Sequence, residues 1–274
     1  MSEKLSVMLV GAGAMGSAML RGWLEGGILD PTRSCVIDPT PSDHISFIVN
    51  QHGVQINPSA DTSADICVIA VKPQQFASVL PSFDWPGIEQ TLFISVAAGV
   101  SLKTIRHHLA GTRAAKAPVV RAMPNLAVAA FKGVTLLYAD GEVTTAQREA
   151  ASRLSSAAGS AHWLSSEDDI DAATALSGSG PAYVFLLAEA LAEAGIAAGL
   201  SPDLARDLAN QTVIGAGALL DQEERSAAQL RKAVTSPGGT TQAAMILLDA
   251  EPGLRGLMKQ AVLAAKARAK ELAD

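Results

Sequence analysis

A glycine-rich loop near the N-terminus most strongly constrains the fold. The stretch "VGAGAMG" places Gly11, Gly13 and Gly16 in G-x-G-x-x-G spacing. A β-like run over 5–10 precedes this loop, a helix-like stretch follows it, and Asp38 ends the next β-like run. This order is typical of a βαβ unit that binds a dinucleotide, with the pyrophosphate at the helix N-terminus. A glycine-rich turn without a ligand is the alternative interpretation.

Each residue of the pattern has an expected task. Gly11 permits the tight turn, Gly13 lets the backbone approach a pyrophosphate, and Gly16 lets the helix pack closely on the strand. Asp38 is placed to accept a hydrogen bond from a ribose 2′-hydroxyl, which favours NADH, and it would repel the 2′-phosphate of NADPH. The alternative for Asp38 is a strand-end acid that faces solvent.

The first half of the chain alternates strand-like and helix-like patterns. Further β-like runs lie at 34–38, 64–71, 91–99, 118–125 and 133–139. The alternation predicts an α/β Rossmann domain with a doubly wound, mostly parallel sheet. The runs are apolar throughout, as expected for strands covered on both faces.

Ligands of such sheets bind outside the carboxyl ends of the strands. We therefore expect the loops 70–73, 97–99 and 123–125 to line the cofactor crevice. Lys72 is either part of this site or an exposed loop cation. Asn125 either meets the nicotinamide carboxamide or caps a turn.

The pattern changes near residue 165. From there on the sequence shows apolar periodicity near 3.6 and no β-like run. We therefore predict a dinucleotide-binding domain over 1–164 and an all-α domain over 165–274. Its helices are rich in small and apolar residues on more than one face, which indicates a buried interface with a second subunit. A compact bundle packed on the sheet is the alternative.

Composition excludes several classes of function. The net charge is −6 without a basic block, which argues against a nucleic-acid partner. Cys35 and Cys67 lie in apolar runs and are interpreted as reduced core residues of a cytoplasmic protein. We find no signal peptide and no run of about 18 uninterrupted apolar residues, so no membrane span is predicted. The adjacent His107 and His108 lack ligand spacing, and no metal site is expected.

A second candidate site is the stretch "VTSPGGTT" at 234–241. Gly238 and Gly239 precede a predicted helix and can expose their backbone N–H groups in conformations that other residues resist. Such N–H groups at a helix start can bind a carboxylate without a fixed cation. The hydroxyls of Ser236, Thr240 and Thr241 add donors. An ordinary loop and helix cap is the alternative interpretation.

Six motifs in order resemble one known family. They are "GAGAMG", "AVKP", "SVAAG", "RAMPN", "SGSGPAY" and "VTSPGGTT", and their order is similar to that of the pyrroline-5-carboxylate reductases over essentially the whole chain. The resemblance implies reduction of 1-pyrroline-5-carboxylate to L-proline with NADPH or NADH. It also implies a helical domain that dimerises by interleaving helices, and dimers that in some members assemble into decamers. Many members carry a neutral or phosphate-tolerant residue where this chain has Asp38, so the usual NADPH preference is open here.

The resemblance also implies roles by position. The pyrophosphate loop comprises Gly11, Ala12, Gly13, Ala14, Met15 and Gly16, and Asp38 and Asn57 lie near the adenosine ribose. Cofactor-contacting loops comprise Ala70, Val71, Lys72, Pro73, Ala97, Ala98 and Gly99. Substrate-site residues comprise Ser236, Gly239, Thr240 and Thr241, with Glu167 and Glu224 near that site.

The absence of a His, Cys or carboxylate from "VTSPGGTT" fits imine chemistry. The cofactor supplies the hydride, and an imine nitrogen is basic enough to arrive protonated or to take a proton from water. The site must then orient the ring and its carboxylate, and Thr241 is expected to polarise the imine nitrogen or relay a water proton. Two other hypotheses are a related β-hydroxyacid dehydrogenase, which usually needs a base near the hydroxyl, and a cofactor-sensing module without turnover.

Overall fold

The computed structural model describes residues 3–59, 62–141 and 143–273. The chain divides into two compact units, Met1–Gly178 with Lys266–Asp274 and, separately, Ser179–Ala265. The last strand ends at Trp163 and the next helix begins at Asp168. The domain boundary expected between residues 164 and 165 falls in this connection and stays a prediction.

The first unit is built on one sheet, which contains eight strands in the described residues. The strand order is β3-β2-β1-β4-β5-β6-β7-β8, and all neighbours are parallel except β6 and β7. The mostly parallel Rossmann sheet is thus confirmed, and the order reverses between β1 and β4. The strands are β1 Val7–Val10, β2 Cys35–Ile37, β3 Gln55–Ile56, β4 Ile66–Ile69, β5 Leu92–Ser95, β6 Val119–Pro124, β7 Gly133–Tyr138 and β8 Gly159–Trp163.

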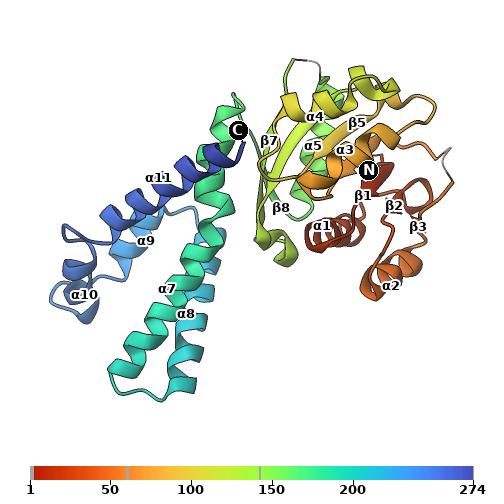
Figure 1. Cartoon of the computed structure of the whole chain (residues 1–274). Coiled ribbons are helices and arrows are strands. Elements are labelled where there is room, and N and C mark those ends of the chain that lie inside the picture. The colour runs from red at the N-terminus through yellow and green to blue at the C-terminus, as the bar shows by residue number, and fades with distance from the viewer. Residues whose placement is uncertain (1–2, 60–61, 142, 274) are drawn as a thin grey trace. The chain divides into compact units, whose positions relative to one another are not determined.

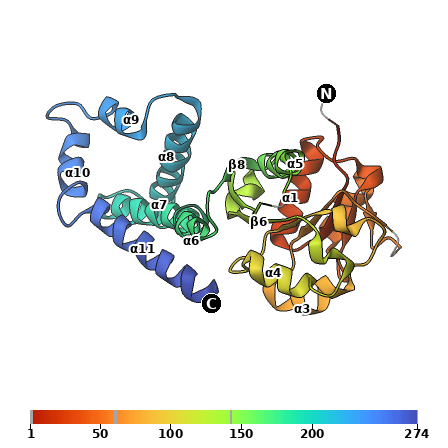
Figure 2. The same cartoon turned by 90° about the horizontal axis from the view of Figure 1, so that it is seen from above.

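Side chains of the central strands alternate between two hydrophobic cores. Val7 and Leu9 of β1 enter the core that α1, α2 and α5 cover, whereas Met8 and Val10 enter the core that α3 and α4 cover. Figure 2 shows α1 and α5 on one side of the sheet and α3 and α4 on the other. Both faces are therefore buried, which is why the strands read as continuous apolar runs.

Helices connect the strands in the first unit. The α-helices are α1 Ala14–Glu25, α2 Asp43–His52, α3 Phe76–Val79, α4 Leu102–Leu109, α5 Thr145–Ser156 and α6 Asp168–Ala173. Short 3-10 turns are η1 Pro31–Arg33, η2 Pro73–Gln75, η3 Leu80–Ser82, η4 Ile88–Gln90, η5 Arg113–Lys116 and η6 Leu126–Ala130, and a π-helical turn, η7, spans Thr174–Gly178. Side-chain caps at Ser42, Ser101 and Thr144 fix where α2, α4 and α5 begin.

The second unit is helical (Figure 1). Its helices are α7 Gly180–Ala197, α8 Pro202–Gln222, α9 Ala227–Ala233, α10 Thr240–Leu248 and α11 Leu254–Ala273, the last of which extends past Ala265. The helices α7 and α8 form a hairpin. At Gly195 a β-carbon would lie 3.1 Å from the Ala205 Cβ, so small residues let the two helices approach closely.

Large apolar side chains of the second unit are exposed in the single chain. They include Phe185, Leu186, Ile214, Ile246 and Leu247. Large apolar side chains exposed in such number are typical of an interaction surface.

Within the described residues, one helical stretch is long and apolar enough to cross a membrane, by length and composition alone. It is Asp168–Ala197, with a mean hydropathy of 1.3, and none of its most apolar window is buried in the chain. The sequence criterion for a membrane span was an uninterrupted apolar run, and no such run is present. The hydropathy criterion instead averages over a window of 18 residues and allows up to two charged residues.

Candidate functional site

The glycine-rich loop joins β1 to α1, and two of its three glycines lie where a side chain would clash with neighbouring backbone. Gly11 has φ of +91°, and a β-carbon there would lie 2.9 Å from the Ala70 carbonyl. At Gly16 a β-carbon would lie 2.2 Å from the Gly11 carbonyl oxygen. These contacts agree with the expected tight turn and close helix–strand packing.

Gly13 differs from its neighbours because the space beside it is open. A β-carbon at Gly13 would meet nothing within 4 Å. Gly13 is also the N-cap of α1 and offers no side chain to the free N–H groups of the first turn. The open space lies next to N–H groups of the helix start that no N-cap side chain binds, and this arrangement suits a bound pyrophosphate.

The side chain of Asp38 connects two loops at the carboxyl edge of the sheet. Its Oδ2 accepts a hydrogen bond from the Ala12 N–H at 2.8 Å, and its Oδ1 accepts one from the Thr40 N–H at 2.9 Å. The acid therefore reaches the glycine-rich loop and is not a strand-end acid directed into solvent. Each oxygen keeps a second lone pair, so a ribose hydroxyl can still be accepted.

Asn57 holds the backbone of Asp38 in place. Its Oδ1 accepts from the Asp38 N–H at 2.9 Å, and its Nδ2 donates to the Asp38 carbonyl at 2.7 Å. Asn57 has φ of +46°, a conformation that Asn tolerates better than most residues. The two residues that the resemblance places near the ribose are therefore direct neighbours.

The two further loops that the sequence predicted at the cofactor follow the carboxyl ends of β4 and β5. The Ala70 N–H donates to the Val10 carbonyl at 2.8 Å, which brings the loop 70–73 beside the glycine-rich loop. Lys72 is exposed, and its backbone N–H donates to the Gln75 side chain. In the loop 97–99, Ala98 is exposed and Gly99 has φ of +73°.

Asn125 lies at the end of β6, and its side-chain amide is occupied by protein groups. Its Oδ1 accepts from the Ala127 and Val134 N–H groups at 3.2 and 3.1 Å, and its Nδ2 donates to the Ser177 carbonyl at 2.9 Å. The residue is only 7% exposed. These hydrogen bonds agree with the interpretation of Asn125 as a turn cap. A contact between Asn125 and the nicotinamide carboxamide stays a prediction.

The two glutamates expected near the substrate occupy different surroundings. Glu167 precedes α6, and its Oε1 accepts from Arg121 Nη1 at 3.0 Å and from the Leu102 N–H at 2.8 Å. Glu224 is exposed in the connection between α8 and α9. The sequence interpretation assigned Arg121 no role, although an Arg inside the apolar run "VVRAMP" is a signal for a buried charge that needs partners.

The stretch "VTSPGGTT" forms a turn that leads into α10. Gly238 has φ of +72°, which favours glycine. At Gly239, the N-cap of α10, a β-carbon would lie 2.4 Å from the Ser236 Oγ. The backbone conformation therefore favours glycine at 238, whereas a β-carbon at 239 would require the Ser236 side chain to move. The helix-start arrangement that the sequence suggested is present.

The N–H groups that are free at this turn differ from those expected. The Gly238 N–H donates to the Gln242 side chain at 2.5 Å, and the Gly239 N–H donates to the Ser236 carbonyl at 3.1 Å. The donors that remain are those of the first turn of α10, which begins with Thr240 and Thr241 and receives no side-chain cap. The glycines thus shape the turn, and the helix start supplies the donors.

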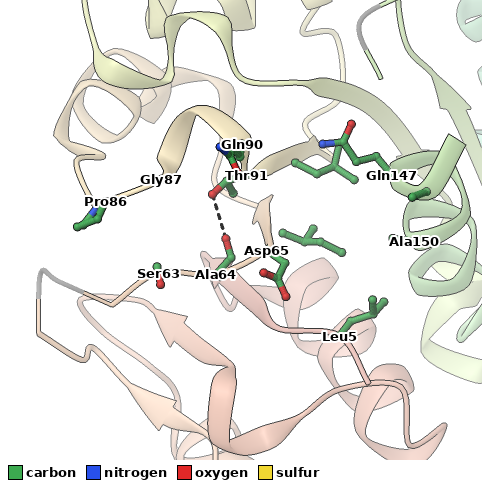
Figure 3. Close-up of a pocket in the computed structure, with 13 residues that line it drawn as sticks. Leu5, Ser63, Ala64, Asp65, Pro86, Gly87, Gln90, Thr91, Gln147 and Ala150 are labelled. Carbon is green, nitrogen blue, oxygen red and sulfur yellow. Dashed lines mark hydrogen bonds between the residues drawn. The ribbon is translucent and has the colours of Figure 1, made fainter. Parts of the chain in front are cut away.

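A pocket of about 410 Å³ lies elsewhere in the first unit. Its lining includes Leu5, Ile66 and Leu92, which stand at the amino ends of β1, β4 and β5. Figure 3 shows Asp65, Gln90 and Gln147 around it, with the Thr91 Oγ1 hydrogen-bonded to the Ala64 carbonyl. Ligands of parallel sheets bind at the carboxyl ends, so this pocket is at the wrong edge for the cofactor.

Other chemistry is not indicated among the described residues. They contain no group of three or more His, Cys, Asp or Glu side chains that could hold a metal ion. Cys35 and Cys67 are free and buried, and burial raises the pKa of both thiols, that of Cys35 to about 11. Buried thiols with raised pKa values are poor nucleophiles.

Two family models match the chain. Residues 167–272 match the family described as pyrroline-5-carboxylate reductase dimerisation. Residues 6–99 match the family described as NADP oxidoreductase coenzyme F420-dependent. The first region contains the exposed apolar helices and the apolar stretch Asp168–Ala197.

Relatives and solved structures agree with these matches. The chain is 37% identical to a pyrroline-5-carboxylate reductase of Pseudomonas aeruginosa, over 98% of this chain and 97% of the relative. It is similar to the structure of such an enzyme from Coxiella burnetii, with 37% identity, 99% and 100% coverage and a TM-score of 0.89. A Plasmodium falciparum enzyme with NADP bound shows 27% identity, full coverage of both chains and a TM-score of 0.80.

The fold, the two sites and the comparisons point to the same class of protein. The glycine-rich loop and the oxidoreductase model establish a nicotinamide cofactor. The helical region establishes homo-oligomerisation. Because the identity extends over nearly the full length of both chains, the chain belongs to the pyrroline-5-carboxylate reductase family.

Proposed function

We propose that this chain reduces the cyclic imine 1-pyrroline-5-carboxylate to L-proline with NADH or NADPH. The observation that carries the proposal is the match to reductases of this name over nearly the whole chain. This match favours an imine reductase over the two other hypotheses, a β-hydroxyacid dehydrogenase and a cofactor-sensing module without turnover.

The residues of the first unit would bind the cofactor. The open space beside Gly13 and the N-terminus of α1 suit the pyrophosphate, and Asp38 suits the adenosine ribose. Ala70 to Pro73 and Ala97 to Gly99 would line the remaining cofactor surface. When bound, the cofactor supplies the hydride.

The turn before α10 would hold the substrate. The first-turn N–H groups and the Ser236 and Thr240 hydroxyls would bind the carboxylate without a fixed cation, which avoids opposing the positive charge of a protonated imine. The half-buried Thr241 hydroxyl would hydrogen-bond the ring nitrogen or relay a proton from water. Because a hydroxyl is a weak acid, orientation of the ring contributes more than acid catalysis.

The charge of Asp38 supports a preference for NADH. Its carboxylate lies at the glycine-rich loop, where a 2′-phosphate would meet a like charge. We further propose a cytoplasmic homodimer formed through the helical region, with assembly of dimers into a decamer as the larger form to test by analytical ultracentrifugation.

Steady-state turnover tests the function directly. Purified protein should oxidise NADH or NADPH when pyrroline-5-carboxylate is added, and the product should be proline. Parallel titration of both cofactors gives the preference in the same experiment. A folded oligomer that is inactive with both cofactors contradicts the proposal.

A further inference from the structure

Arg121 is a buried charge on an interior strand of the sheet. It lies on β6 and is only 5% exposed. Its Nη1 lies 3.0 Å from the Glu167 Oε1, and its Nη2 lies 3.8 Å from the Asp171 Oδ1. A buried guanidinium requires such partners, so Arg121 fixes the position of the Glu167 carboxylate.

The same Glu167 oxygen holds the start of α4. The Leu102 N–H, the first of α4, donates to Glu167 Oε1 at 2.8 Å. A carboxylate at a helix N-terminus also interacts favourably with the helix dipole. Glu167 therefore connects the segment before α6 to the end of the loop that leads from β5 into α4.

The other end of that loop lies beside Arg121. Ser95, the last residue of β5, is the register partner of Arg121, and its Oγ accepts from the Ala97 N–H at 3.4 Å. The loop 96–101 thus starts beside the Arg121 backbone and ends at the carboxylate partner of the Arg121 guanidinium. Ala97 to Gly99, the cofactor-contacting residues, lie between these two points.

We infer that Glu167 is a positioning residue for the cofactor, which acts by holding the loop 96–101 through Arg121 and the Leu102 N–H. The inference rests on the proposed cofactor role of Ala97 to Gly99. It differs from the role near the substrate that the resemblance implied for Glu167. Loss of a substrate contact would raise the KM for pyrroline-5-carboxylate, whereas loss of a loop restraint would raise the cofactor Kd. The two roles can therefore be separated by experiment.

The test compares Glu167→Gln and Glu167→Ala with Asp168→Asn in the full-length oligomer. Gln keeps an acceptor for the Leu102 N–H but loses the charge opposite Arg121, whereas Ala loses both. Asp168→Asn removes an exposed charge one residue away and is the matched control. Cofactor Kd is measured by fluorescence without substrate, and hydrogen exchange of 96–104 is measured without any ligand.

Glu167→Ala should raise the cofactor Kd by about tenfold, the size of one charge-assisted hydrogen bond, with faster exchange in 96–104. Glu167→Gln should fall between Glu167→Ala and the wild type, and Asp168→Asn should match the wild type. The KM for pyrroline-5-carboxylate at saturating cofactor should change less than about twofold.

A raised KM for pyrroline-5-carboxylate with an unchanged cofactor Kd would overturn the inference and favour a substrate contact. Unchanged cofactor Kd and exchange in a folded Glu167→Gln variant would overturn it as well, even where Glu167→Ala fails to fold. Turnover by the wild type tests the proposed function separately, because it does not depend on these variants.

Discussion

At the scale of single residues, the Asp38 carboxylate joins two loops and is also proposed to influence cofactor preference. Its two oxygens accept the Ala12 and Thr40 N–H groups, so it ties the glycine-rich loop to the end of β2. We propose that the same charge lies where the 2′-phosphate of NADPH would bind. Under this proposal, cofactor preference and loop geometry are coupled at this position.

Replacing Asp38 should shift the cofactor preference. Asp38→Ser removes the like charge, so the ratio of kcat/KM for NADPH to that for NADH should rise by at least about tenfold. Affinity for both cofactors should fall, because the shorter side chain loses a charged acceptor at the loop. Parallel steady-state assays give both values. Asp43→Ser, which removes an exposed acid from α2, is the control, and an unchanged ratio in Asp38→Ser would show that Asp38 does not face the ribose.

Thr241 should affect chemistry more than cofactor binding. Thr241→Ala removes the hydroxyl proposed for the imine nitrogen, so kcat should fall by about tenfold while the cofactor Kd stays within about twofold. Thr241→Ser keeps the hydroxyl and should restore most of the turnover. Equal loss of kcat and of cofactor affinity in a folded Thr241→Ala variant would count against a substrate-side role.

At the scale of elements, the passage from β1 into α1 shows how the motif predicted structure. The sequence pattern predicted close packing at Gly16 and an open approach at Gly13, and a β-carbon at these positions would meet backbone at 2.2 Å and nothing within 4 Å, respectively. The spacing of the glycines could predict these features because the backbone geometry of a turn between a strand and a helix depends mainly on residues close together in the sequence.

Two alanine substitutions should separate folding from cofactor binding. Gly16→Ala should destabilise the protein by about 2–3 kcal/mol, because the Gly11 backbone cannot move aside. Gly13→Ala should change stability by less than about 1 kcal/mol but raise the cofactor Kd, since its methyl group enters the space beside the helix start. Denaturant unfolding and fluorescence titration measure the two effects. Normal cofactor affinity in Gly13→Ala would contradict a pyrophosphate at this loop.

Contacts between distant elements were not predictable in the same way. The Asn125 side chain donates to the Ser177 carbonyl, 52 residues away, and Glu167 accepts from Arg121, 46 residues away. The charge of Arg121 within an apolar run signals a buried group, but it does not show which residues are its partners. Partners of this kind depend on which strands become neighbours.

At the scale of the whole molecule, the helical unit exposes apolar faces that a single chain leaves uncovered. Leu186 on α7 is 64% exposed and Leu247 on α10 is 76% exposed. These helices lie within residues 167–272, which match the family described as pyrroline-5-carboxylate reductase dimerisation, so we propose that their apolar faces form the interface. The same faces make one helical stretch resemble a membrane span by composition, because a subunit interface and a lipid-facing helix are both apolar.

A charge on this surface should weaken the oligomer. Leu186→Glu places a carboxylate in the expected interface, so the dimer dissociation constant should rise by at least about 100-fold. Phe47→Glu is the matched control, because Phe47 is 67% exposed on α2, outside the dimerisation match. Sedimentation velocity measures both variants. A wild-type sedimentation profile for Leu186→Glu would place the interface elsewhere.

The sequence by itself determined the class of fold, the cofactor loop and the turn before α10. These features follow from periodicity, glycine spacing and helix starts, all of which act over a few neighbouring residues. Only the tertiary structure decided that Asp38 reaches Ala12 and that Glu167 holds the start of α4. Those contacts join residues 26 and 65 positions apart. They form because strand pairing, such as that of β1 with β2, brings together loops that are distant in the sequence.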